Sequence, residues 1–198
     1  MRSLPVSESL RIVLVDEKPD RSGDLERVLE AEGYRVVARL SGRDDLRRRL
    51  AELAADVVIV DMQSPDRDVL EDMQRLHREN PRPIVMFVDE SDSESIRAAV
   101  RAGVSAYVVD GDKRRRVKPI LEVAIARFQE FQALRSELDA ARTTLAERKL
   151  IERAKGILMS KRRVSEDEAY RLMRKMAMDR KRRLADVAEQ VIAMADLL

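Results

Sequence analysis

The sequence predicts an α/β domain with a parallel sheet, followed by a long helix and a small helical unit. Short apolar segments alternate with helical stretches over the first 110 residues. A heptad-like apolar series comes next, and two further amphipathic helices end the chain. Strands that alternate with helices of roughly 10–15 residues favour a parallel sheet that is covered by helices on both faces.

Five segments have the apolar, β-branched composition of buried strands. These strands are expected at 11–15, 35–39, 56–60, 83–88 and 106–109, and the helices between them at 20–32, 43–54, 68–79 and 92–102. Gly33 and Gly103 directly follow two of these helices, where a left-handed residue commonly ends a helix.

Acidic residues follow the predicted strands. Asp16 and Glu17 come after the first strand and Asp61 after the third, while Asp89 and Asp110 follow the fourth and fifth. Ligands of open parallel sheets bind beyond the carboxyl ends of the strands. Carboxylates gathered there repel one another unless a cation joins them, and oxygen-only ligands suit Mg²⁺. We therefore expect a magnesium site at Asp16, Glu17 and Asp61, although any one of them alone could simply cap a loop.

The charge of the chain is unevenly distributed. Residues 1–110 contain 17 basic and 23 acidic side chains, whereas residues 148–183 contain 14 basic and five acidic ones. An acidic domain joined to a basic unit is typical of a regulator in front of a polyanion binder. A helix surface that is only solvated would not need such an excess of positive charge over negative charge.

Several functional classes are disfavoured by composition. The chain has no cysteine, so disulfides, thiolate metal sites and thiol nucleophiles are excluded. No apolar run approaches the roughly 20 residues that span a bilayer, and the N-terminus lacks the apolar core of a secretory signal, so a cytoplasmic location is expected. An enzyme is the least expected class, because no nucleophile–base pair or glycine-rich phosphate loop is present. The single histidine, His77, is expected on a solvated helix surface.

One helix is expected from Arg116 to Ser160, with Pro119 in its first turn. Its apolar residues fall at positions 121, 124, 128, 131, 134, 138, 141 and 145. This heptad spacing contains one extra step of three, and it predicts a two-stranded coiled coil that makes the protein a homodimer. Alternatively, the same seam packs back on its own N-terminal domain. The predicted divisions are a domain at 1–115, a coiled-coil linker helix at 116–147 and a helical domain at 148–198.

The C-terminal domain is predicted to be a three-helix bundle whose first helix continues from the linker. Ser165 and Glu168 have the spacing of a capping box, which begins the second helix. The third helix carries Leu184, Val187 and Val191 on one face.

The bundle leaves a basic surface for which a phosphate backbone is the expected partner. We expect RNA contacts from Arg148, Lys149, Arg153, Lys155, Lys161, Arg162, Arg174, Lys175, Arg180, Lys181, Arg182 and Arg183. The domain has one aromatic residue, Tyr170, which excludes base stacking on a sheet of aromatic side chains. No helix-turn-helix pair with a glycine turn is visible.

Two N-terminal segments, VLVDEKPD (13–20) and VVIVDMQSPDRD (57–68), resemble the metal-binding and phospho-acceptor segments of response-regulator receiver domains. The resemblance covers residues 10–125 and implies a five-stranded flavodoxin-like fold, with Asp61 as phospho-acceptor and with Asp16 and Glu17 holding Mg²⁺. Receivers normally carry Ser or Thr and Lys where this chain has Val88 and Asp110. These atypical switch positions suggest control mainly by contact with another protein.

Residues 143–192 closely resemble the ANTAR domain, through RKLIERAKGILM (148–159) and EDEAYRLMRKMAMDRKRRLADVAEQVI (166–192). The resemblance implies a dimer that binds paired hexanucleotide stem-loops in leader mRNA and prevents formation of a terminator. A receiver joined to an ANTAR domain is most similar to the transcription antiterminators of nitrate and nitrite assimilation. That similarity implies a regulatory partner, either a nitrate-sensing protein or a histidine kinase. The alternatives are a DNA-binding two-component response regulator and a dimeric scaffold whose basic face is only solvated.

Overall fold

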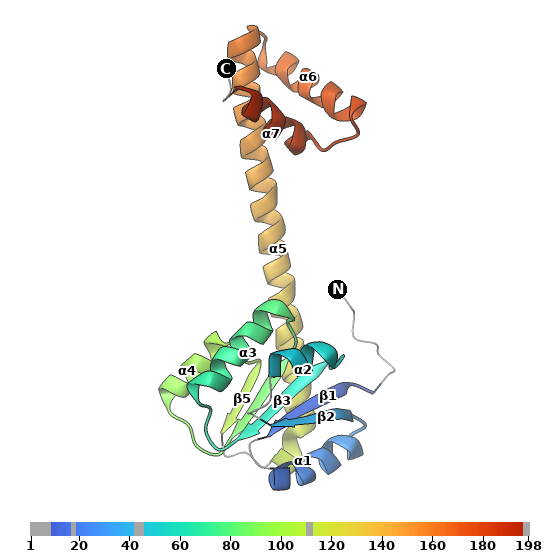
Figure 1. Ribbon diagram of the computed structural model, residues 1–198, viewed down its shortest axis with the longest axis vertical. Coiled ribbons are helices and arrows are strands. Elements are labelled where there is room, and N and C mark those ends of the chain that lie inside the picture. The colour runs from blue at the N-terminus through green and yellow to red at the C-terminus, as the bar shows by residue number, and fades with distance from the viewer. Residues whose placement is uncertain (1–8, 17–18, 42–45, 110–112, 196–198) are drawn as a thin grey trace. The chain divides into compact units, whose positions relative to one another are not determined.

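The computed structural model describes residues 9–16, 19–41, 46–109 and 113–195. The chain divides into two compact units, Met1–Gln132 and Ala133–Leu198. The N-terminal unit contains the sheet, and the C-terminal unit is helical (Figure 1).

The N-terminal unit is built on a five-stranded parallel sheet. Its strands are β1 (Arg11–Asp16), β2 (Arg35–Ser41), β3 (Val57–Met62), β4 (Ile84–Val88) and β5 (Ala106–Val109). Their order is β2-β1-β3-β4-β5, and all four neighbouring pairs are parallel. The predicted flavodoxin-like α/β fold is confirmed.

Helices cover both faces of this sheet (Figure 1). They are α1 (Pro19–Ala31), α2 (Leu46–Glu52), α3 (Arg67–Glu79), α4 (Ser93–Arg101) and the first part of α5 (Lys113–Arg162). Carboxylates begin two of them, because Asp66 accepts a hydrogen bond from the Val69 N–H and Asp92 accepts one from the Ser95 N–H. Hydrogen bonds from Ser95 hold the pKa of Asp92 below its usual value.

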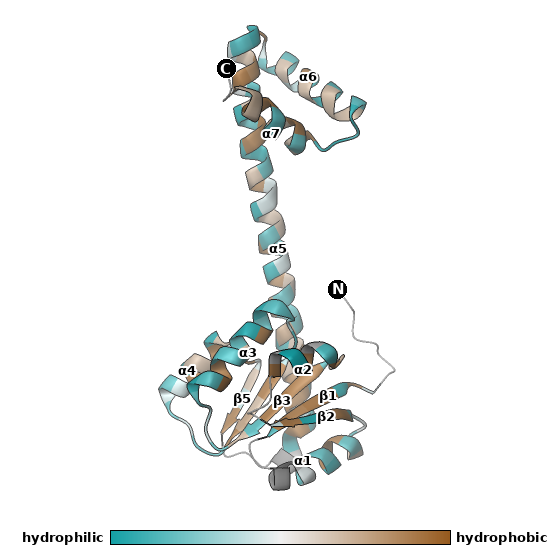
Figure 2. Ribbon diagram, viewed as in Figure 1, coloured by the Kyte–Doolittle hydropathy of each residue, from teal (hydrophilic) through white to brown (hydrophobic). Residues whose placement is uncertain are grey.

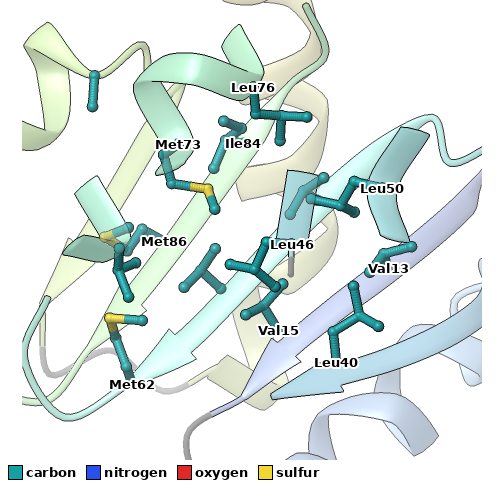
Figure 3. Close-up of a cluster of buried hydrophobic side chains, with 14 of the residues drawn as sticks. Val13, Val15, Leu40, Leu46, Leu50, Met62, Met73, Leu76, Ile84 and Met86 are labelled. Carbon is teal, nitrogen blue, oxygen red and sulfur yellow. The ribbon is translucent and has the colours of Figure 1, made fainter. Parts of the chain in front are cut away.

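The alternation of side chains along the strands produces two apolar cores. On one face, Val13 and Val15 pack with α2 and α3, as Figure 3 shows for Leu46, Leu50 and Met73. The other face buries Ile12, Leu14, Ile59 and Phe87 against α1 and α5. Strand residues are accordingly the most apolar part of the N-terminal unit (Figure 2).

Helix α5 starts three residues before the predicted Arg116, at Lys113. Pro119 therefore lies inside the helix, and its placement in the first turn was wrong. A proline at this position removes one backbone hydrogen bond. Val117 and Leu121 on either side of it are buried against the sheet, and this burial holds the helix in place.

The sequence suggested that the single histidine is simply solvated, but the structure shows it packed against two aromatic rings. The His77 ring packs edge-on to Phe128 and tilted against Phe131, with centroids 6.4 and 6.2 Å away. A Cβ atom on Gly103 would clash with the same ring. His77 thus fastens the end of α3 to α5, and Gly103 leaves room for it.

The C-terminal unit packs the end of α5 with α6 (Glu166–Asp179) and α7 (Leu184–Ala195). Its core contains Ala154, Met173, Ala177, Val187, Ala188, Val191 and Ile192. The capping box at the start of α6 is confirmed, since Ser165 and Glu168 bond each other's backbone N–H groups. No described helix is both long enough and apolar enough to cross a membrane.

The predicted heptad seam of α5 has two different environments. Leu121 and Ala124 are fully buried in the core of the N-terminal unit. From Phe131 onward the large seam residues are 50–56% exposed, namely Phe131, Leu134, Leu138 and Leu145. The alternative that the seam packs on its own domain thus applies to its first part only, and the coiled coil stays a prediction for the rest.

Candidate functional site

Two of the predicted magnesium ligands lie side by side at the carboxyl edge of the sheet. Asp16 ends β1 and is the direct register partner of Asp61 in β3. Both are buried, at 6% and 4% exposure. The third predicted ligand, Glu17, lies outside the described residues. Among the residues that the structure describes, no group of three or more side chains that could hold a metal ion is present. Two buried carboxylates on adjacent strand ends are donors that fit Mg²⁺.

One of the two predicted switch positions, Val88, lies on β4, the strand next to β3. Val88 ends β4, is 1% exposed and belongs to the same apolar core as Met62, its register partner. Its side chain therefore packs as a hydrophobic residue and offers no donor to a phosphoryl oxygen. Asp110 lies outside the described residues, so its role as a switch position stays a prediction.

Sequence reasoning missed a hydrogen bond next to these positions. The hydroxyls of Ser91, after β4, and Tyr107, in β5, are 2.8 Å apart. The pair joins the loop after β4 to the neighbouring strand. Two hydroxyls sixteen positions apart leave no periodic pattern, so only the strand order could have suggested their contact.

In the C-terminal unit, Lys155 is placed differently from the other predicted RNA-binding residues. Its side chain is only 10% exposed, and its Nζ lies 2.6 Å from Glu166 Oε1 and 2.9 Å from Glu152 Oε1. The hydrogen bond to Glu166 raises the pKa of Lys155 and lowers the pKa of Glu166. Lys155 thus ties α5 to the first turn of α6, while its contact with RNA stays a prediction.

The remaining predicted cations are exposed, and they lie on α5, on α6 and in the loop before α7. They are Arg148, Lys149, Arg153, Lys161, Arg162, Arg174, Lys175, Arg180, Lys181, Arg182 and Arg183. In this loop, Arg180 donates to Gln190 at 3.0 Å, and Arg183 bonds both Glu147 and Asp186 at 2.9 Å. The hydrogen bond to Asp186 raises the pKa of Arg183. Such exposed contacts are weak and can be exchanged for a phosphate.

The outward face of α6 is strongly cationic. Ala169, Met173 and Ala177 point into the core. The opposite face exposes Arg171, Arg174, Lys175 and Met178, which are three to four positions apart or adjacent. The acidic first turn of α6 lies at the start of the helix, and one of its carboxylates, Glu166, is already ion-paired with Lys155.

Two family models match the chain. The response regulator receiver domain matches residues 12–121, and the ANTAR domain matches residues 139–192. Together they include both the acidic strand edge and the cationic helices.

Relatives support the same architecture. The transcriptional regulatory protein PdtaR of Mycobacterium tuberculosis is 33% identical over 92% of this chain and 89% of its own length. The nitrate regulatory protein of Klebsiella oxytoca is 35% identical over 40% of this chain, which is 20% of that protein.

Solved structures match the N-terminal unit. The receiver domain of a modulated diguanylate cyclase from Desulfovibrio desulfuricans G20 has a TM-score of 0.54 at 21% identity, and it covers 62% of this chain and 98% of that one. A LuxR-family response regulator from Aurantimonas sp. SI85-9A1 has a TM-score of 0.53 at 27% identity, with 61% and 88% covered. With a receiver fold at one end and an ANTAR match at the other, the chain belongs to the response regulators that join a receiver domain to an ANTAR domain.

Proposed function

We propose that this protein is an RNA-binding transcription antitermination regulator. The observation that carries the proposal is the exposed cationic surface of residues 148–183, which lies within a unit matched by the ANTAR model. Lys and Arg side chains on such a surface neutralise phosphates and release counterions. The proposed targets are paired stem-loops in leader mRNA, whose binding prevents a terminator from forming.

The charge pattern alone would serve duplex DNA equally well. Support for RNA comes from the ANTAR match, and the described helices of this unit include no glycine turn of the helix-turn-helix type. A DNA-binding two-component response regulator is therefore the competing function.

The active form is a homodimer held by α5. The exposed seam residues Phe131, Leu134, Leu138 and Leu145 are the side chains that a second copy would cover. A dimer presents two cationic surfaces, which matches a target made of two stem-loops.

The N-terminal unit controls RNA binding. Asp61 is the phospho-acceptor, and Asp16, Glu17 and Asp61 hold Mg²⁺, which neutralises charge at the acceptor. Val88 cannot hydrogen-bond a phosphoryl oxygen, so phosphorylation alone is a weak trigger. A regulatory protein partner, either a nitrate-sensing protein or a histidine kinase, supplies the main control.

The signal belongs to nitrate or nitrite assimilation. Support for this part is the similarity to the Klebsiella oxytoca nitrate regulatory protein, and it extends over 80 residues only. PdtaR, which is similar to 92% of this chain, has a name that does not refer to nitrate.

Sequencing the RNA that copurifies with the full-length protein tests the proposal. Cells are grown with and without nitrate, and a variant with Lys149, Arg174 and Lys175 changed to Ala serves as control. We expect leader segments with two adjacent hairpins, enriched over the control variant and dependent on nitrate. Enrichment of genomic DNA in place of RNA would favour the DNA-binding alternative, and nitrate-independent enrichment would remove only the proposed signal.

A further inference from the structure

Four described residues have a left-handed backbone conformation. Two lie in the N-terminal unit and are glycines, Gly33 at φ 88° and Gly103 at φ 90°. The other two lie in the C-terminal unit and are cations, Arg163 at φ 54° and Lys181 at φ 51°. The two cations lie in the small left-handed helical region, whereas the two glycines have φ values beyond it.

This geometry is unfavourable for Arg and Lys. In the left-handed region the Cβ atom of an L-residue comes too close to the following carbonyl oxygen, and only glycine avoids that contact. Both cations stand at the ends of helices, where glycine is the usual residue. Arg163 directly follows α5, and Lys181 follows Arg180, the C-cap of α6.

Backbone bonding within the folded chain does not require a cation at position 163 or 181. At the end of α6, the Lys181 N–H donates to the Met178 carbonyl at 3.2 Å, and the Arg182 N–H donates to the Ala177 carbonyl at 2.9 Å. A glycine at position 181 would make the same backbone bonds without strain. Both side chains are exposed, and neither is hydrogen-bonded or ion-paired to another described residue. Strain of this kind is typical of functional positions.

The two cations flank the cationic face of α6. This helix has 14 residues, which corresponds to a length of about 21 Å. Arg163 lies before its start and Lys181 after its end, while Arg171, Arg174 and Lys175 are exposed between them. A row of this kind is complementary to a chain of phosphates.

We propose that Arg163 and Lys181 bind RNA phosphates at the two ends of α6, so that the RNA backbone runs along this helix. The proposal rests on the proposed RNA-binding function and adds a path for the RNA across the unit. The left-handed turns fix the direction in which each long side chain leaves the backbone. The contact with RNA phosphates is then the reason why Arg and Lys stand at these strained positions in place of glycine.

The test uses full-length protein and a pool of two-hairpin RNAs with randomised six-nucleotide loops, enriched by the wild-type protein. Arg163→Gly and Lys181→Gly should each raise the melting temperature of the C-terminal unit by about 4–8 °C, because strain is relieved. Each should also weaken RNA binding about tenfold, since a charged hydrogen bond is lost. The slope of log K against log salt should fall by about 0.7 per variant.

Arg163→Lys and Lys181→Arg are the matched controls, because they keep both the charge and the strain. They should bind RNA within about threefold of wild type and melt as it does. Glycine variants that bind with unchanged affinity and salt slope would overturn the proposal, and so would glycine variants that are not stabilised. If the wild-type protein enriches no RNA from the pool, the proposed function itself fails, which is a separate result.

Discussion

Lys155 shows how one side chain can organise the C-terminal unit. It is the cation of residues 148–183 that is buried, and it bonds Glu152 within its own helix and Glu166 on α6. Its pKa is raised and that of Glu166 is lowered, each mainly by the hydrogen bond between them. Both groups are therefore charged throughout the neutral range.

The link between Lys155 and Glu166 should be sensitive to acid. Because the pKa of Glu166 is lowered by folding, its stabilisation is complete above the usual value of 4.5 and is lost as pH falls through the lower folded-state value. Wild type should melt at a higher temperature than Glu166→Gln at pH 7, and this gap should be smaller at an acidic pH below 4.5. A gap of equal size at both pH values would show that the carboxylate charge is not what stabilises α6.

A second prediction at this scale concerns the start of α6. The Ser165 hydroxyl accepts a hydrogen bond from the Glu168 N–H, and the backbone N–H of Ser165 donates to the Glu168 carboxylate. Ser165→Ala should lower the free energy of unfolding by about 1 kcal/mol, measured by urea denaturation. Ser160→Ala is the control, because Ser160 is an exposed serine inside α5, and it should have almost no effect. Equal effects of the two substitutions would argue against the cap.

At the scale of elements, α5 serves both units. Its first turns complete one face of the sheet, its last turns form a wall of the C-terminal core, and the part between them exposes large apolar residues. A seam with half-exposed leucines at heptad spacing is stabilised when a second copy covers it.

Leu138→Glu should therefore weaken dimerisation by at least about tenfold, since it places a charge in the seam of both helices. Ala140→Glu is the matched control, because Ala140 is exposed on the same helix but lies outside the seam. Sedimentation velocity at micromolar concentrations should show a dimer for wild type and for the control, and a monomer for Leu138→Glu. A wild-type monomer at tens of micromolar would contradict the coiled coil.

Most elements could be predicted from the sequence, because strand composition and helix caps are local signals. The strands start and end within two residues of the expected positions, and the capping box at Ser165 located the start of α6. The start of α5 was harder to place, because Pro119 resembles a first-turn proline and only the burial of its neighbours against the sheet permits it deeper in the helix.

The candidate sites could be predicted only in part from the sequence. The pairing of Asp16 with Asp61 follows from a rule about parallel strands. The burial of Lys155 and the bond between Ser91 and Tyr107 depend on which helix or strand lies opposite, and one-dimensional charge or hydroxyl patterns do not contain that information.

At the scale of the whole molecule, the receiver domain should respond weakly to phosphorylation. Val88, the proposed switch position, is packed in the core and has no hydroxyl to offer a phosphoryl group. Acetyl phosphate with Mg²⁺ should change RNA affinity by less than about threefold, well below the usual range of allosteric coupling. Asp61→Asn is the control. A large response that Asp61→Asn abolishes would show that phosphorylation is the main control.

The central claim is that the cationic helices of the ANTAR domain bind RNA. Its most direct test is equilibrium binding of an enriched two-hairpin RNA by the full-length protein, with duplex DNA of equal length as competitor and at several salt concentrations. We predict that affinity falls with rising salt and that the DNA competes at least tenfold less well than the unlabelled RNA. Equal competition by DNA, or affinity for neither nucleic acid at 100 mM salt, would contradict the claim.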